Sequence, residues 1–384
     1  MTPNTRAFRH ALHFANRKPE TLLKGALALI APLALTLAIG CGGTSTVKTT
    51  TTTPTPVLDK ALWVANGANV VEFIPAQLAA GVSDPAPHLA INSAAFGAPQ
   101  GVTFDATGNL WVIDGGTVAG GGTVQPALLE FTAAQLANLG KVNNPSPAIV
   151  IHSTNFTFPQ QAVFDATGNL WVSDNGSNAV FVFTPTLLAS PSPNARPFIA
   201  LASNPAFNGP LGIAFDATGN LYVANNGSTT IYRFNAANLP TTASSVTLAP
   251  DVTLTDDGAG SIQAPWALAF DSNGDLWSSN ANPPNTLVEF TPTQLAAGGT
   301  PTPSITLSSV AVQTNQTLVA PNGIAFDNLG DLAAASSAAP FGIADFAKSQ
   351  LAPTTSGPAP STFLVGATTT LNAPAGVTFG PVVE

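Results

Sequence analysis

Charged residues make up only 8% of this 384-residue chain, and its formal net charge is −9. Beyond residue 40, six Lys and Arg residues stand against 19 Asp and Glu residues. So few scattered cations cannot form a phosphate-binding surface, which argues against nucleic-acid binding. The 33 Gly and 34 Pro residues predict many short elements joined by turns rather than long helices.

The first 40 residues have the pattern of a secretory signal peptide. Residues 1–24 are basic, and residues 25–40 form an apolar run that is short for a membrane span, which needs about 20 apolar residues. Small residues precede Cys41, the only cysteine, and this arrangement resembles a bacterial lipobox. The resemblance implies cleavage before Cys41 and lipidation of its thiol, which would anchor the protein in the bacterial cell envelope. A plain signal peptide with an incidental cysteine is the alternative.

The chain is expected to divide into three parts. Residues 1–40 are the predicted lipoprotein signal peptide, and residues 41–56 are a Thr-rich tether whose composition is typical of a flexible linker. Residues 57–384 are the predicted folded domain, which would be displayed at the outer membrane or on the periplasmic face.

One motif recurs along the folded region. Its clearest copy, residues 99–112, reads Pro-Gln-Gly-Val-Thr-Phe-Asp and then Gly-Asn-Leu-Trp-Val. The equivalent phenylalanines are separated by 60, 51, 55, 56 and 53 residues, and they are Phe104, Phe164, Phe215, Phe270, Phe326 and Phe379. Residues 61–66 and residues 374–379 are the two halves of a sixth, split copy. Such intervals are typical of propeller blades, and the split copy predicts a closed ring.

Each repeat contains four short apolar runs bounded by turn residues. In residues 99–151 these runs are 102–104, 110–113, 128–131 and 148–151, and both faces of the predicted strands are apolar. Sheets that are apolar on both faces must be covered on both sides. We therefore predict an all-β fold, a six-bladed β-propeller of four-stranded antiparallel blades, whose ring is closed by the C-terminal strand joining the N-terminal blade. A single helical turn is expected after each third strand.

The motif resembles the NHL repeat and its six-bladed relatives across residues 57–384. The chain is also similar in fold to gluconolactonase-like and streptogramin-lyase-like propellers, and the resemblance specifies the fold far better than the function. In propellers of this type the residue before the motif glycine lies at the mouth of the central channel. In this chain these residues are Gln100, Gln160, Leu211, Trp266, Asn322 and Ala375.

Neither relative's chemistry can be assembled from these positions. The gluconolactonase-like proteins hold a divalent cation there with Asn, Asp and Glu, whereas this set has one Asn and no carboxylate, so no metal or other cofactor is expected. The lyase-like proteins use a channel histidine as the base, but His88 and His152 fall in stretches expected at the outer edges. Asp105 and its equivalents recur at one turn of nearly every blade and are interpreted as turn-forming residues.

The sequence therefore favours a non-catalytic, lipid-anchored binding module for a protein or glycan, with no catalytic residue assigned. The alternative is a gluconolactonase-like hydrolase or a streptogramin-lyase-like enzyme. An aromatic plate surrounded by amides suits stacking and hydrogen bonding to a ligand. The candidate ligand-binding residues are Gln100, Gln160, Gln161, Trp266 and Asn322. The last blade lacks the motif aromatic, because residues 332–335 read Leu-Ala-Ala-Ala.

Overall fold

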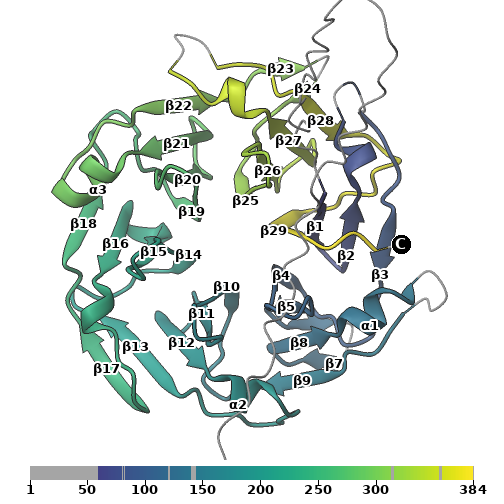
Figure 1. Ribbon diagram of the computed structural model, residues 1–384, viewed down its shortest axis with the longest axis vertical. Coiled ribbons are helices and arrows are strands. Elements are labelled where there is room, and N and C mark those ends of the chain that lie inside the picture. The colour runs from purple at the N-terminus through teal and green to yellow at the C-terminus, as the bar shows by residue number, and fades with distance from the viewer. Residues whose placement is uncertain are drawn as a thin grey trace, which may run out of the picture. The chain divides into compact units, whose positions relative to one another are not determined.

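The computed structural model describes residues 59–383, apart from residues 80, 82, 120–121, 140–143, 313–314 and 354–356. Residues 55–384 form one compact unit, in which five four-stranded sheets and one five-stranded sheet stand around a central axis (Figure 1). The predicted signal peptide, Cys41 and tether lie outside the described residues. Among the residues described, no helix is long and apolar enough to cross a membrane.

The first three blades follow one pattern from the channel outward. Blade 1 consists of β29 (Pro374–Gly380), β1 (Ala61–Asn66), β2 (Asn69–Phe73) and β3 (Leu89–Ile91). Blade 2 consists of β4 (Pro99–Phe104), β5 (Leu110–Asp114), β8 (Ala127–Phe131) and β9 (Ile149–His152). Blade 3 consists of β10 (Pro159–Phe164), β11 (Leu170–Asp174), β12 (Ala179–Phe183) and β13 (Ile199–Ser203), with β17 (Ser244–Leu248) added at its outer edge.

The other three blades repeat the pattern. Blade 4 consists of β14 (Pro210–Phe215), β15 (Leu221–Asn225), β16 (Thr230–Phe234) and β18 (Val252–Thr255). Blade 5 consists of β19 (Pro265–Phe270), β20 (Leu276–Asn280), β21 (Thr286–Phe290) and β22 (Ile305–Ser308). Blade 6 consists of β25 (Pro321–Phe326), β26 (Leu332–Ser336), β27 (Gly342–Phe346) and β28 (Thr362–Val365). The six-bladed propeller is thus confirmed.

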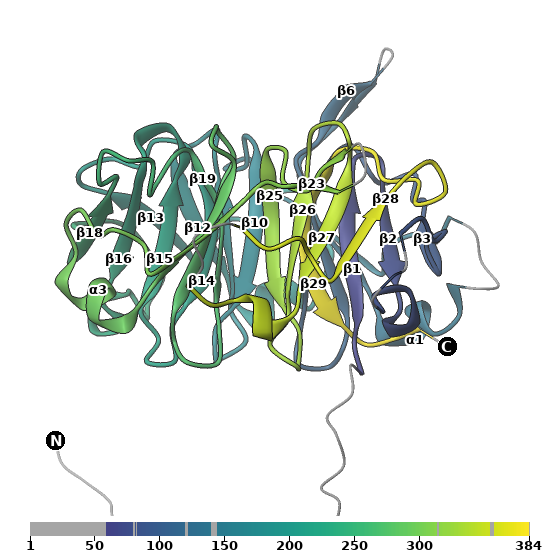
Figure 2. The ribbon, with the colours of Figure 1, turned by 90° about the horizontal axis from the view of Figure 1, so that it is seen from above.

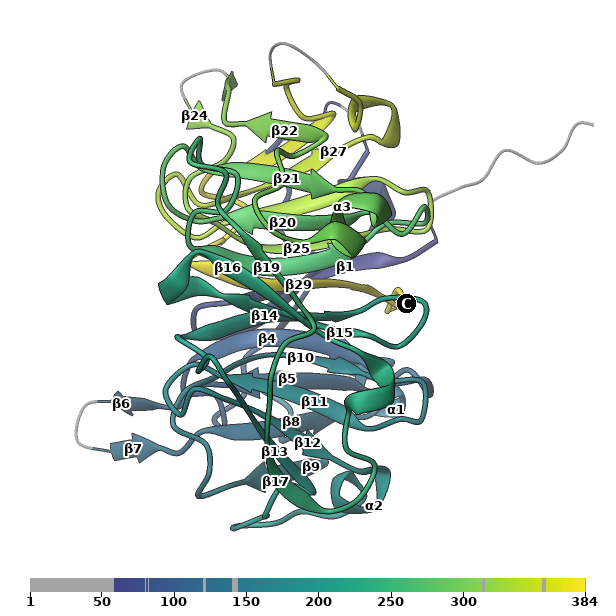
Figure 3. The same cartoon turned by 90° about the vertical axis from the view of Figure 1, so that its left-hand side faces the viewer.

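A short helical element follows the third strand of each blade, as predicted. These elements are η1 (Pro75–Gln77), α1 (Ala133–Leu136), α2 (Pro185–Leu188), η4 (Ala236–Asn238), α3 (Pro292–Ala297) and η5 (Lys348–Gln350). The helices lie toward one face of the ring, whereas the hairpin of β6 (Thr117–Ala119) and β7 (Gly122–Val124) projects from the other (Figures 2 and 3). A second hairpin joins β23 (Ala311–Val312) and β24 (Asn315–Gln316).

The ring is closed by β29, which pairs antiparallel with β1. Leu62 lies opposite Phe379 and Val64 opposite Val377, so the two halves of the split motif meet in one sheet. This closure removes the free edges that an open array of blades would expose. The predicted ring closure is therefore confirmed.

Neighbouring blades are held together by aromatic contacts between their motifs. The Trp63 and Phe104 rings meet edge to face with centroids 5.6 Å apart, and Trp171 and Phe215 do so at 5.4 Å. Five of the six interfaces contain such a pair. At the interface between blades 6 and 1, the buried Ala333 stands in place of the aromatic residue. Each aromatic pair contributes about 0.5–1.5 kcal/mol beyond the area that it buries.

The recurrent aspartates bind their own turns. The Asp105 carboxylate accepts hydrogen bonds from the backbone amides of Thr107 at 2.9 Å and Asn109 at 3.0 Å, and from the Trp111 indole at 3.3 Å. These donors favour the charged form, so the pKa of Asp105 is lowered although burial opposes the shift. The same amide contacts recur at Asp165, Asp216, Asp271 and Asp327. Their carboxylates are therefore engaged by the architecture.

The outer edges of several blades are covered by the following blade. After its third strand, the blade 4 chain forms β17, which pairs in parallel with β13 of blade 3 before returning to its own sheet. Shorter contacts of this kind join Ser192 to Ile151, Gly299 to Leu254 and, around the ring closure, Ser83 to Val365. We call these loop segments the edge straps. They give hydrogen-bond partners to strands that would otherwise be open to other chains.

Candidate functional site

Every innermost strand is irregular at the same place. Its register with the second strand shifts just after the motif proline, as between Pro159 and Ala162 of β10. The equivalent strands of the other blades show the same shift. A β-bulge re-aims the side chains that it contains. The positions from which the candidate site was predicted all lie in these bulges.

At four of the bulges the motif glycine lets two blades approach closely. A Cβ on Gly101 would lie 2.6 Å from the Gln160 carbonyl oxygen, and one on Gly212 would lie 2.6 Å from that of Trp266. Gly376 meets the Gln100 carbonyl in the same way at 2.7 Å, and Gly323 meets that of Ala375. No larger residue fits at such a separation without moving the backbone.

Blades 3 and 5 lack the motif glycine and use a serine instead. Gln161 and Ala267 occupy the glycine position, and Ser173 and Ser279 lie beside them on the second strand. The Ser173 hydroxyl donates to the Leu211 carbonyl of blade 4 at 2.5 Å, and the Ser279 hydroxyl donates to the Asn322 carbonyl of blade 6 at 2.7 Å. Both serines are fully buried. Each hydroxyl therefore makes the contact that the glycine backbone makes elsewhere.

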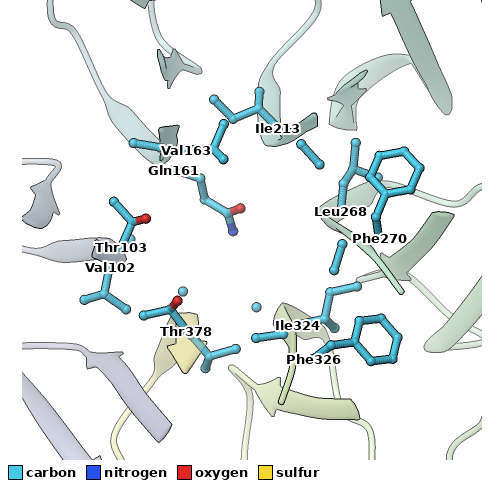
Figure 4. A pocket seen from close by; sticks show the side chains of 18 of the residues that line it. Val102, Thr103, Gln161, Val163, Ile213, Leu268, Phe270, Ile324, Phe326 and Thr378 are labelled. Atoms are coloured by element: carbon cyan, nitrogen blue, oxygen red, sulfur yellow. The ribbon is translucent and has the colours of Figure 1, made fainter. Parts of the chain in front are cut away.

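The central channel contains a cavity of about 310 Å³. Its wall is formed by the innermost strands of all six blades and is mostly aliphatic, with Val102, Ile213 and Ile324 among the lining side chains (Figure 4). Thr103, Gln161 and Thr378 are the polar side chains of this wall, and the Gln161 amide points into the space (Figure 4). That amide makes no hydrogen bond to any residue that the structure describes.

Of the five predicted ligand-binding residues, only Gln161 lines this cavity. Gln160 and Asn322 are 2% and 4% exposed, and Nε2 of Gln160 and Oδ1 of Asn322 have no hydrogen-bond partner among the described residues. The Gln100 amide donates to the Ala98 carbonyl at 3.2 Å, and Trp266 is half-buried. The structure thus does not gather the five side chains around one cavity, because the bulge separates Gln161 from the residues one position earlier.

Thr103 and Thr378 are cavity residues that sequence reasoning missed. They occupy the same position of the motif, two residues after the glycine, where the other blades have Val163, Ala214, Ala269 and Ala325. The alternation of side chains along a strand places this position on the same side as the glycine. A comparison of the six motif copies at that position would have found them.

The charged and imidazole groups lie away from the cavity. Nδ1 of His88 is 2.9 Å from Oε2 of the buried Glu72, and Nδ1 of His152 is 3.1 Å from the Pro126 carbonyl. No Asp, Glu, His or Cys lines the channel cavity. Across the described residues there is also no group of three or more such side chains that could hold a metal ion.

The most perturbed carboxyl group belongs to blade 6. Burial, followed by repulsion from Asp331 and then from Asp327, raises the pKa of Asp345 to about 7. Asp345 lies across the strand pair from Ala333, the position that holds a tryptophan in blades 1, 2, 3 and 5. It is on the third strand of its blade and does not line the channel cavity.

No family model and no curated protein matches the sequence. Among solved structures, the chain is similar to a protein of unknown function from Bacteroides caccae, at 9% identity over 84% of this chain and 99% of that one, with a TM-score of 0.52. It is also similar to a putative 6-phosphogluconolactonase from Bacteroides fragilis, at 13% identity over 84% and 98%, with a TM-score of 0.51. A streptogramin B lyase aligns at 16% identity over 65% and 66%, with a TM-score of 0.39. Likeness at these identities extends to the fold alone.

Proposed function

We propose that this protein is a lipid-anchored, non-catalytic binding module of the bacterial cell envelope, and that its central channel receives a segment of a partner protein. The observation that carries the proposal is the Gln161 amide, which points into an apolar cavity and has no described partner. The NH2 group of an amide held in this position can donate a hydrogen bond to a ligand, and its carbonyl oxygen can accept one.

The composition of the wall favours a protein segment over a glycan. A sugar needs a hydrogen-bond partner for most of its hydroxyls, whereas the cavity supplies three polar side chains among aliphatic ones. The innermost strands also present the free backbone edges of six sheets to the channel. Backbone groups and apolar walls suit an extended peptide with a polar side chain that reaches Gln161.

The same wall offers no group for acid–base chemistry. General acid–base catalysis needs a titratable side chain within hydrogen-bond reach of the reacting proton, and the cavity is lined by none. A binding role therefore agrees with the geometry better than lactone hydrolysis or a lyase reaction. Gln100, Gln160, Trp266 and Asn322, which the sequence predicts at the channel mouth, do not line the cavity and are not part of this proposal.

The proposal can be tested with a library of random heptapeptides selected against the full-length chain. We expect the selected peptides to bind Gln161→Ala about tenfold or more weakly than the wild type. The variant loses one buried hydrogen bond and the packing of the glutamine side chain against the peptide. Gln125→Ala, which changes an exposed glutamine outside the channel, is the matched control. Equal affinity for both variants would remove the channel from the proposal. Turnover of a gluconolactone by the purified chain, lost on metal chelation, would favour the hydrolase instead.

The anchor is tested separately. We expect Cys41→Ser to move the protein from the membrane fraction to the soluble fraction, because the lipidated thiol would be missing. Fractionation followed by immunoblotting measures this change. A variant that stays in the membrane fraction would contradict the lipobox assignment and leave the channel proposal untouched.

A further inference from the structure

A second apolar hollow lies between blades 3 and 4. Its volume is about 520 Å³, which exceeds that of the channel cavity. Its walls are formed by residues 164–167, 169, 171 and 198–199 of blade 3 and by residues 215–217, 219, 236 and 239–241 of blade 4. Its apolar lining includes Trp171, Phe198, Leu239 and Pro240. We call it the blade 3–4 groove.

The groove is open because the backbone of blade 4 becomes extended directly after its helical turn. The turn η1 of blade 1 is equally short, but its Leu78 keeps a helical backbone and is 6% exposed. In α1, α2 and α3, a leucine of the turn is buried between two blades, with exposures of 3% for Leu136, 6% for Leu188 and 4% for Leu295. In blade 4 the turn ends at Asn238, and Leu239 is already extended, with φ −68° and ψ 134°. Pro240 follows and cannot continue a helix. Leu239 therefore stays half-buried at the groove wall.

The corresponding place between blades 1 and 2 is occupied by the chain itself. After β29 the residues Pro381–Val383 run along that interface instead of forming the usual turn. The Trp63 indole donates to the Pro381 carbonyl at 3.1 Å, and the Val383 amide donates to Oε1 of Glu72 at 2.9 Å. Val383 is 6% exposed and belongs to the same hydrophobic core as Trp63.

The two places match residue by residue in the repeat. Trp63 corresponds to Trp171, and Leu89 to Ile199, from their places in the strand register. Across the interface, Phe104 corresponds to Phe215, and Ala133 to Ala236. Two differences are informative. Glu72 is replaced by Val182, which lies opposite Trp171. The Trp171 indole already donates to the Asp165 carboxylate of its own turn at 2.8 Å, whereas the Trp63 indole donates to the Pro381 carbonyl. An occupant of the blade 3–4 groove would thus be held by apolar contacts, without the carboxylate that holds Val383.

We propose that the blade 3–4 groove is a peptide-binding site for an extended apolar segment of a partner protein, with a proline followed by β-branched residues. At the equivalent interface two blades away, Pro381–Val383 packs against Trp63 in place of the motif turn, which shows that a segment of this chemistry fits such a surface. The site is independent of the channel. It lies at the ends of the blades where the motif aspartates form their turns, and Asp165 and Asp216 are both part of its wall.

The test uses the full-length protein and a labelled peptide of residues 379–384, Phe-Gly-Pro-Val-Val-Glu, as the probe, with fluorescence anisotropy as the measurement. We expect saturable binding that weakens at least tenfold in Ala236→Trp, which fills the groove, and in Leu239→Asp, which places a charge in its wall. Ala133→Trp, at the equivalent position of the occupied interface, is the matched control and should bind as the wild type does. A peptide with both valines changed to aspartate should not bind.

Three outcomes would overturn the proposal. The first is the absence of saturable binding to the wild type. The second is affinity in Ala236→Trp and Leu239→Asp within twofold of the wild type. The third is loss of binding in Ala133→Trp alone, which would mean that the peptide displaces the chain's own Pro381–Val383. Concentration-dependent self-association that disappears in Ala236→Trp would assign the groove to a second copy of this chain rather than to a partner. Circular dichroism checks that each variant is folded. If Ala236→Trp does not fold, Leu239→Asp alone tests the groove.

Discussion

The six blade interfaces are sealed near the channel in two ways, and the difference explains where the candidate site lies. In blades 1, 2, 4 and 6 the motif glycine touches a carbonyl of the next blade, a contact that we call the glycine seal. In blades 3 and 5 a buried serine hydroxyl donates to the equivalent carbonyl of the next blade, and we call this contact the serine seal. The serine seal does not need a glycine beside it, so the motif position can carry a side chain. In blade 3 that side chain is Gln161, whose amide points into the cavity.

The largest effect is expected from breaking a glycine seal. Gly323→Leu would place a Cβ against the Ala375 carbonyl and 2.7 Å from the Val377 nitrogen, where only backbone movement could relieve the overlap. We expect a loss of about 3 kcal/mol or more in the free energy of unfolding, measured by urea denaturation. Ala267→Leu is the control, because the serine-sealed blade 5 already holds a Cβ at this position. If Gly323→Leu is no worse than Ala267→Leu, the two seals do not differ as described.

Removing a serine seal should cost less. Ser279→Ala would leave the buried Asn322 carbonyl without its donor, which costs about 1–3 kcal/mol. Thermal melting should register a fall of a few degrees in Tm. Ser278→Ala is the matched control, since that neighbouring buried serine makes only a 3.5 Å contact. Adding Ala267→Gly to Ser279→Ala should recover part of the loss by restoring the close backbone approach. A double variant less stable than Ser279→Ala would contradict this interchange.

Blade 6 extends the comparison, because it lacks the motif aromatic and contains the carboxyl group with a pKa of about 7. The Asp345 pKa is raised in the folded state, so between about pH 4 and pH 7 the folded protein binds more protons than the unfolded one. Its contribution to stability is therefore greatest at low pH and declines as the pH rises through that window. Asp345→Asn should flatten this decline and raise Tm at pH 8 by about 2 °C or more. Asp59→Asn, at an exposed carboxylate, is the matched control.

The smallest effect on stability is expected at Gln161. Its amide has no described partner, so Gln161→Ala should change Tm by about 1 °C or less, as measured by calorimetry. Its peptide affinity should nevertheless fall, as proposed above. A drop of several degrees would indicate that the amide supports the fold and does not serve a ligand.

Much of the fold could be predicted from the repeat. The spacing of Phe104 and its equivalents specifies six blades, and the split motif at residues 61–66 and 374–379 specifies the closure. The turn role of Asp105 followed from its recurrence. These features depend on local contacts that recur from blade to blade, so the copies of the motif support the same prediction.

The site was less predictable for a physical reason. A bulge inserts one residue into the pairing and changes the face on which Gln160 and Gln161 lie, and no sequence period reports that change. The serine seals and the course of Pro381–Val383 depend on contacts between blades that are distant in the chain. Only the departure of Gln161 from the motif glycine marked blade 3 as different.

The edge straps give the ring a direction along the chain. The straps on blades 2, 3 and 4 each belong to the blade made directly after the one that they cover, so these outer strands can gain their straps as the chain is made. The strap from Ser83 to Val365 runs the opposite way, since its early segment waits for a strand made about 280 residues later. Blade 1 thus lacks its inner strand until β29 has been made, and the outer strand of blade 6 receives its strap from blade 1. Both blades therefore complete their edges when the ring closes. Ring closure is therefore the last step in covering the strand edges, and it follows the covering of blades 2, 3 and 4.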